Sequence, residues 1–240
     1  MSLSAPQIGF DRFIHLDWVA AALDVRVGNG NVDDLGLLLE AAGLSLAARK
    51  KTRTVLNRLW LEPRPDLGAL ATRGVEIHRS APEVPIAALS WGMAIASYPF
   101  FGKVAELVGR LSALQGDCAA AEVHRRMSET YGEREGTYRM TNMVLQSQAS
   151  WGAIERAEKG KRLIRRPPIK VDDDGAIAWL IEAALRYSGK AVSVASLPAL
   201  AVIYPFVLDR PLGYVASNSP MLELRTEGSG HQAVFLTDQV

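Results

Sequence analysis

The sequence predicts a mainly α-helical, folded protein organised in three regions. The chain has 240 residues, of which 48% are hydrophobic and 22% charged, and 27 Lys and Arg nearly balance 26 Asp and Glu. A chain of this length and composition can bury most of its apolar surface, whereas disordered chains are poorer in apolar residues. Apolar residues recur mainly at helical spacing between Gly and Pro punctuation. We expect a helical N-terminal region (1–99), a central unit (100–170) and a smaller helix-plus-hairpin unit (171–240).

The N-terminal region carries helix signals and almost no strand signals. The expected helices cover residues 34–43, 45–60, 66–74 and 85–98. Ser45 and Asp66 are residue types that cap helix N-termini, and Pro85 can open the last of the four helices. The second helix begins with a cluster of cations, which is most often a solvated face: Arg49, Lys50, Lys51 and Arg53.

Two uncharged stretches are long enough to be tested as membrane spans. Val84–Gly102 and Ala191–Leu208 each approach the length that crosses a bilayer, about 20 residues. Each stretch is interrupted by two prolines, and lipid offers no water to the carbonyls that proline leaves unpaired. We expect both stretches to be buried core, with no membrane partner.

Cysteine usage and the first residues favour the cytoplasm. Cys118 is the only cysteine, so the fold cannot depend on an internal disulfide and a reducing compartment fits. The opening MSLSAPQIGFDRF has no basic stretch followed by an apolar run, so no secretory signal is expected.

The central region predicts three helices and a hairpin. Apolar residues at helical spacing run from Val104 to Leu114, and Asp117 can cap a helix that spans Cys118–Tyr131. After a short connection, Thr137 can cap a third helix that ends at Ser150. Two short strands over 153–158 and 161–166 then flank a Lys-Gly turn.

This order of helix, helix, turn, helix and basic hairpin resembles the winged helix-turn-helix superfamily over residues 100–170. The resemblance implies that the helix 137–150 is a recognition helix for the DNA major groove and that the hairpin 154–166 is the wing. It also implies a transcriptional regulator, and many members pair as two-fold dimers on palindromic sites.

The helix 137–150 has one apolar face and one polar face. At about 100° per residue, the side that should pack inward carries Met140, Val144, Ser147 and Trp151. The opposite side carries residue types that meet bases and phosphates: Tyr138, Arg139, Asn142 and Gln146. An ordinary amphipathic helix with a solvated face would show the same spacing.

Charge favours DNA over a solvated face. From Arg110 to Lys170 the chain has twelve Lys and Arg against seven Asp and Glu, a net +5, although the whole chain is only +1. We expect Arg139, Asn142 and Gln146 to contact bases, and Tyr138 and Arg134 to contact the backbone. The expected wing contacts to phosphate or minor groove are Lys159, Lys161, Arg162, Arg165 and Arg166. A charged edge hairpin protected from aggregation is the alternative.

The C-terminal region predicts a helix over Ala176–Tyr187 and a hairpin whose strands are Met221–Arg225 and Gln232–Leu236. This pattern is compatible with a second winged-helix module. Its few basic residues and acidic lead-in, Asp172–Asp174, favour packing or self-association over DNA.

No catalytic, cofactor or metal motif is found. Phosphate-loop, dinucleotide, zinc-protease and serine-hydrolase signatures are absent from the sequence. We therefore expect a cytoplasmic protein without cofactor that binds double-stranded DNA as a transcriptional regulator or DNA-associated accessory factor, with a homodimer or protein partners. The alternative is an interaction scaffold within a larger, DNA-modifying or defence complex, which would use Trp18, Trp60 and Trp91 as surface anchors. A nuclease or modification subunit ranks last.

Overall fold

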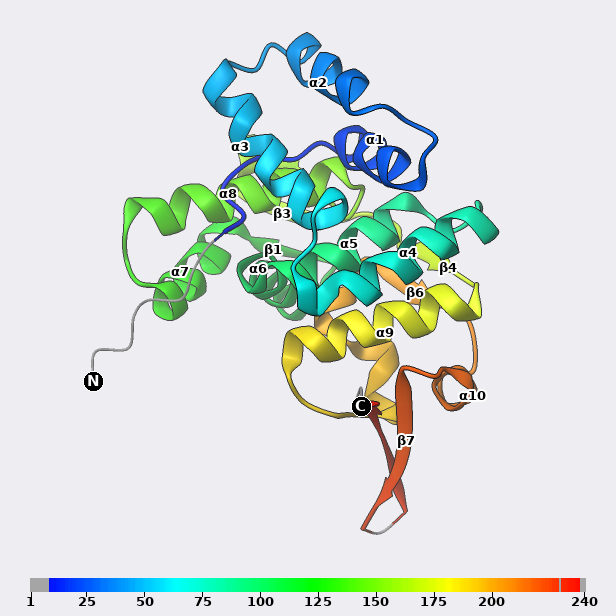
Figure 1. Cartoon of the computed structure of the whole chain (residues 1–240). Coiled ribbons are helices and arrows are strands. Elements are labelled where there is room, and N and C mark those ends of the chain that lie inside the picture. Colours follow the sequence, from blue (N-terminus) through cyan, green and yellow to red (C-terminus); the bar gives the residue numbers. More distant parts are fainter. Residues whose placement is uncertain (1–8, 229, 238–240) are drawn as a thin grey trace, which may run out of the picture.

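The computed structural model describes residues 9–228 and 230–237, and they form a mainly α-helical fold with three small sheets (Figure 1). The α-helices are α1 (Leu16–Val27), α2 (Val32–Ala41), α3 (Leu46–Leu56), α4 (Gly68–Ser80), α5 (Ile86–Ser97), α6 (Pro99–Leu111), α7 (Ala120–Tyr131), α8 (Glu135–Ser150), α9 (Asp174–Ser188) and α10 (Leu212–Asn218). The strands are β1 (Asp117–Ala119), β2 (Ile154–Ala157), β3 (Arg162–Arg165), β4 (Ile169–Val171), β5 (Val192–Ser193), β6 (Phe206–Leu208), β7 (Leu222–Glu227) and β8 (His231–Leu236). Short non-α turns are η1 (Asn57–Leu61), η2 (Pro65–Leu67), η3 (Glu158–Gly160), η4 (Val194–Ala199) and η5 (Ala201–Ile203).

Helix α5 is the centre of the core. All of its residues from Ala87 to Ser97 are buried, which is the expected position for a helix that is apolar on every side. Gly92 allows α9 to approach closely, because a Cβ there would lie 2.1 Å from Cζ3 of Trp179. The prediction that Val84–Gly102 is buried core is confirmed, and no helix within the described residues has the length and apolar character of a membrane span.

Two predictions about N-terminal helix caps have different outcomes. Ser45 caps α3 as expected, with its Oγ accepting a hydrogen bond from the amide of Ala48 at 3.3 Å. Asp66 is not a cap, because its carboxylate is ion-paired to Arg64 at 2.9 Å and the chain there forms a 3-10 turn. Helix α4 begins after that turn and continues to Ser80, well beyond the predicted end.

The three tryptophans proposed as surface anchors are wrong for that role. Trp18, Trp60 and Trp91 are all buried in the core. The indole of Trp91 donates to the carbonyl of Val202 at 2.8 Å, so even its polar atom has a partner inside the protein. The scaffold alternative therefore loses these tryptophans as a supporting feature.

The central region contains one strand that the sequence did not predict. Asp117 opens β1 instead of capping a helix, because residues Asp117–Ala119 pair antiparallel with β3. Likewise Thr137 is buried inside α8, which begins at Glu135 with Arg134 as its N-cap residue. The predicted hairpin is confirmed as β2 and β3, and β3 lies between β1 and β2 in the sheet.

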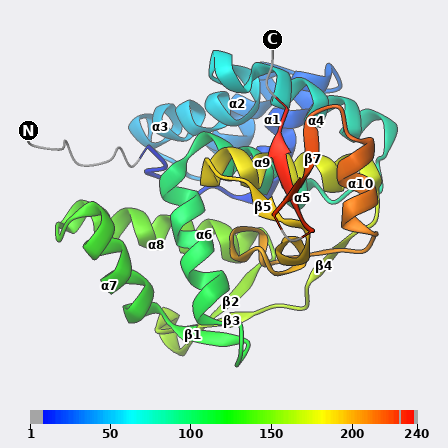
Figure 2. The same cartoon turned by 90° about the horizontal axis from the view of Figure 1, so that it is seen from below.

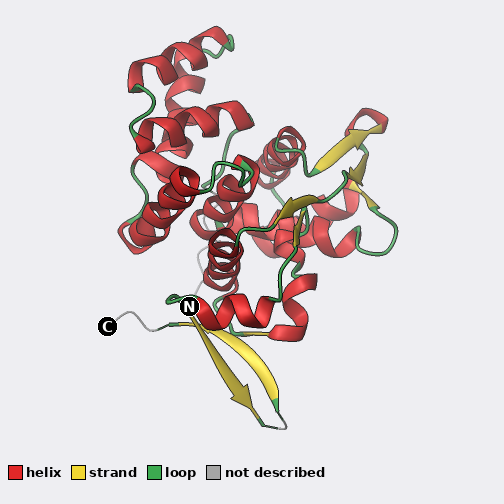
Figure 3. Ribbon diagram, turned by 90° about the vertical axis from the view of Figure 1, so that its right-hand side faces the viewer, coloured by secondary structure: helices red, strands yellow, loops and turns green. Residues whose placement is uncertain are grey.

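The C-terminal region contains a sheet of similar strand order. After α9, strand β5 is followed by short helical turns, β6, α10 and the β7–β8 hairpin, and β8 lies between β5 and β7. The predicted hairpin is thereby confirmed, and it projects from the body of the molecule (Figures 1 and 3). Helix α9 packs on α5 in the core.

The second apolar stretch is only partly core, so that expectation was too broad. Between Ala191 and Leu208 only Leu197 and residues 202–206 are buried. Prolines and short turns fold the rest along the surface, where β6 pairs in parallel with β4. The acidic lead-in is likewise engaged: Asp173 caps α9, while Asp172 and Asp174 form ion pairs with Lys170 and Arg210.

Candidate nucleic-acid interface

Helix α8, which follows α7, carries its predicted polar face at the surface. Gly132, with φ of 89°, ends α7, and α8 begins three residues later. The apolar side of α8 is buried as predicted, through Met140, Val144, Ser147 and Trp151. On the opposite side Tyr138 and Arg139 are exposed, and Asn142 and Gln146 are half-buried. This exposed side of α8, together with Glu135, is here called the α8 outer face.

Two side chains of the α8 outer face are held by neighbouring elements. The Tyr138 ring stacks on His124 of α7 with centroids 4.0 Å apart and 20° between the ring planes. The Asn142 Oδ1 accepts a hydrogen bond from Nη2 of Arg156 on β2 at 2.6 Å. These contacts bring α7, α8 and β2 together around one surface. Burial, and secondarily the charge of Arg156, lowers the pKa of His124, so its imidazole is neutral in the stack at neutral pH.

The hairpin turn is held in an uncommon backbone conformation. Glu158 and Lys159 have φ of 52° and 58°, and Gly160 has φ of 85°. The positive φ favours glycine at position 160, where a Cβ would lie 2.8 Å from Nη2 at the flexible end of Arg156. The turn leaves the side chains of Lys159 and Lys161 exposed.

Two of the predicted wing cations are engaged within the protein. Arg162 pairs with Asp117 on the neighbouring β1, and its Nε lies 3.0 Å from the carboxylate. Arg165 is half-buried: its Nε donates to Ser112 Oγ at 2.6 Å, and its guanidinium lies 5.1 Å from the ring centroid of Tyr204. Arg165 therefore attaches the end of β3 to α6 and η5.

The cations that remain unpaired lie at the start of α8 and in or just after the hairpin. On α7, Arg125 and Arg126 are ion-paired to acidic residues of their own helix. Five exposed cations of residues 110–170 have no ion-pair partner among the described residues: Arg134, Arg139, Lys159, Lys161 and Arg166. The first two lie at the start of α8, and the others lie in the hairpin turn or just after β3. We call these five residues the free cations.

An N-terminal segment fixes the other end of α8. The amide of Ile14 donates to Ser147 Oγ at 2.9 Å, and the Ile14 carbonyl accepts from Trp151 Nε1 at 3.0 Å. The amide of Leu16 donates to Ser150 Oγ at 3.2 Å. This contact spans more than 130 residues of sequence. It holds the C-terminal end of α8, while the outer face nearer the N-terminus stays open.

Arg156 is one of the twelve basic residues between Arg110 and Lys170, but it was not predicted as a site residue. Strand alternation could have found it, because Arg156 lies two residues from the buried Ile154 and so on the same face of β2, toward α8. No local sequence pattern predicts the contact of Ile14 with α8.

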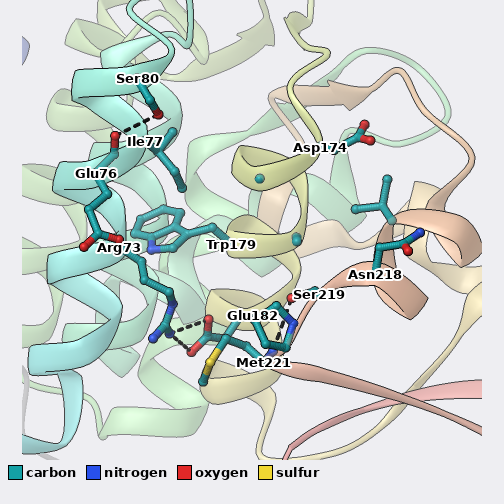
Figure 4. A pocket seen from close by; sticks show the side chains of 14 residues that line it. Arg73, Glu76, Ile77, Ser80, Asp174, Trp179, Glu182, Asn218, Ser219 and Met221 are labelled. Atoms are coloured by element: carbon teal, nitrogen blue, oxygen red, sulfur yellow. Dashed lines mark hydrogen bonds and ion pairs between the residues drawn. The ribbon is translucent and has the colours of Figure 1, made fainter.

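A hollow lies between α4, α9 and α10, away from the predicted site residues, with a volume of about 290 Å³ (Figure 4). Its most buried polar group is the carboxylate of Glu182, 1% exposed. Arg73 of α4 reaches both Glu182 oxygens, at 2.6 and 2.7 Å, and Nε of Arg186 donates at 2.8 Å. The carboxylate is therefore fully engaged by two guanidinium groups, and this ionic cluster joins α4 to α9.

Comparison with known proteins adds no relative: no protein-family model, no curated protein and no solved structure matches this chain. The functional conclusion therefore depends on the geometry alone.

Proposed function

We propose that this protein binds double-stranded DNA through the α8 outer face and the β2–β3 hairpin, as a winged helix-turn-helix module. The observation that carries the proposal is that the five free cations lie on two neighbouring segments, at the start of α8 and in or just after the β2–β3 hairpin. A cation that is already paired with a carboxylate of the protein gains little binding free energy from a phosphate. A free cation displaces counterions that are condensed on the DNA, and their release favours binding.

The element order also supports the proposal. Residues 99–165 run helix, strand, helix, helix and hairpin, and the second hairpin strand lies at the centre of the sheet. Apart from β1, this is the order of elements on which the winged-helix resemblance was based, with α8 as the recognition helix. In that role α8 would lie in the major groove and the hairpin turn would rest on the adjacent backbone.

The structure refines which side chains are expected to make each contact. Arg139 and Gln146 project from the α8 outer face and can meet guanine and adenine edges. Asn142 keeps its amide NH₂ available as a donor, since Arg156 occupies its oxygen. Glu135, at the start of α8, can accept from the amino group of cytosine and would repel phosphate, so it favours base recognition over backbone binding at that position.

Backbone contacts are assigned to Arg134, Tyr138, Lys159, Lys161 and Arg166. Arg162 and Arg165 are left out of this set because Asp117 and Ser112 already engage them. A role as a transcriptional regulator or a DNA-associated accessory factor follows from this proposal.

The test is a fluorescence-anisotropy titration of a random-sequence duplex at several salt concentrations. The variant Lys159→Ala/Lys161→Ala/Arg166→Ala removes three free cations. Each lost phosphate contact should reduce the slope of log affinity against log salt by about 0.9. The matched control, Arg64→Ala/Lys190→Ala/Arg210→Ala, removes the same charge from surfaces away from α8 and the hairpin, and it should leave the slope unchanged. Equal slopes for the wild type and the first variant would refute the proposal.

A further inference from the structure

Helices α2 and α3 expose an apolar surface that the fold does not use. Eight large hydrophobic residues of the described chain are exposed, and four of them lie on these two short helices: Val32, Leu37, Leu38 and Leu46. Only Leu35 and Leu39 of α2 are buried. The two helices lie at one edge of the molecule, where α2 packs on α1 and α3 (Figure 1).

Three of those residues line a groove between α2 and α3 with a volume of about 570 Å³. Val32, Leu37 and Leu46 are 43%, 63% and 62% exposed. The lining residues recur three or four positions apart on each helix, so both walls present a continuous stripe. At Gly36 the floor is open, because a Cβ there would meet no atom within 4 Å. The groove therefore has room for a side chain of another helix at this position.

The two walls of the groove carry opposite charge. Helix α2 contains three acidic residues and no basic residue: Asp33, Asp34 and Glu40. Helix α3 contains four basic residues and no acidic residue: Arg49, Lys50, Lys51 and Arg53. Within the chain the two sets form one ion pair, between Arg49 and Glu40 at 3.0 Å. Asp33 and Lys50, both exposed on the walls, have no ion-pair partner among the described residues.

We propose that this groove is the contact surface between two copies of this chain, related by a two-fold axis that places α2 of each copy against α3 of the other. A two-fold contact uses the same patch on both partners, so the patch must be complementary to itself. The α2–α3 surface meets that condition, because acidic α2 would face basic α3 twice while Leu37 and Leu46 enter the opposite grooves. An unrelated acidic helix would match α3 but would be repelled by α2.

This assembly leaves the β2–β3 hairpin accessible. Figure 2 shows α2 and α3 at the opposite end of the molecule from β1, β2 and β3. In two copies joined through α2 and α3, the β2–β3 hairpin of each copy would therefore lie at the end of that copy away from the contact. The self-association inference does not depend on DNA binding and is tested without DNA.

The first test is sedimentation velocity of the full-length protein across a range of concentrations. We expect a reversible dimer, and we expect Leu37→Arg to raise its dissociation constant at least about tenfold, because the arginine would be placed in both copies of the groove. Leu114→Arg is the matched control: Leu114 is almost fully exposed and lies beyond α6, so this variant should dimerise like the wild type. A wild-type protein that stays monomeric, or a Leu37→Arg dimer of unchanged affinity, overturns the proposal.

The second test separates a second copy from any other occupant. Asp33→Lys alone and Lys50→Glu alone should each weaken dimerisation at low salt, since each brings like charges together twice. An equimolar mixture of the two variants should restore it, because each α2 then faces an α3 of opposite charge again. If the mixture associates no better than the separate variants, the proposed pairing of α2 with α3 is wrong.

Discussion

Arg165 and Arg166 are adjacent arginines for which the structure predicts opposite phenotypes. Arg165 donates to Ser112 Oγ and to the Gly109 carbonyl, and it lies over the Tyr204 ring. Arg166 is exposed and has no ion-pair partner among the described residues. Replacing either arginine with Met removes one charge and keeps most of the side-chain length. Each variant is therefore the control for the other.

The expected magnitudes follow from these contacts. A hydrogen bond from a charged group contributes about 1.5–3 kcal/mol, and a half-exposed cation–π contact adds about 0.5–1 kcal/mol. With partial solvent access, Arg165→Met should lower the free energy of unfolding by about 2–4 kcal/mol. For a chain of this size that corresponds to a Tm decrease of about 5–15 °C. Arg166→Met should leave Tm within about 1 °C of the wild type.

DNA titrations should separate the two variants in the opposite direction. Arg166→Met should reduce the slope of log affinity against log salt by about 0.9, as the loss of one phosphate contact predicts. Arg165→Met should leave the slope unchanged below its Tm. The combination of thermal melts and anisotropy titrations tests both arms. Two results would contradict these roles. One is a lower Tm for Arg166→Met, and the other is an altered salt slope for Arg165→Met without a change in Tm. Either result would mean that Arg165 is not the structural residue or that Arg166 is not the DNA contact.

Two further predictions concern ionisable groups, the half-buried His124 and the buried Glu182. Burial lowers the pKa of His124, so the unfolded chain takes up a proton below about pH 6.5 while the folded chain does not. Its contribution to stability is therefore present above that pH and decreases as pH falls toward the lowered folded pKa. Urea midpoints should show a steeper loss for the wild type than for His124→Phe, and parallel curves would contradict this. At the α4–α9 cluster, Glu182→Gln leaves Arg73 and Arg186 without their carboxylate and should cost about 3–5 kcal/mol. Chemical denaturation measures that cost, and the double variant Glu182→Gln/Arg73→Met should lose less than the sum of the single variants.

Helical spacing predicted much of the fold correctly. The inner face of α8 could be derived from the sequence, since Met140 and Val144 recur at the period of a helix and both are buried. The cap of α3 by Ser45 was equally local. The mainly α-helical class follows from such signals, because a helix satisfies its hydrogen bonds within a few residues of sequence.

Contacts between distant segments were not predictable in the same way. Asp117 is a good cap by residue type, yet its strand forms because β3, more than 40 residues later, pairs with it. The separation of Arg165 from Arg166 depends on Ser112 and Tyr204, which no local pattern connects to the hairpin. Charge counting therefore identified the basic region but could not say which cations are already neutralised.

The contact of Ile14 with α8 has a consequence for anyone who would study the basic hairpin in isolation. Trp151 donates to Ile14 and lies against Phe101, which in turn packs on Phe10. Cutting the chain before residue 100 would remove Phe10 and Ile14. The Phe101 ring would lose the contact with Phe10, and the Trp151 indole N–H would lose its acceptor. A truncated fragment would then tend to aggregate through newly bared rings, so negative binding data from it would say little about the intact molecule.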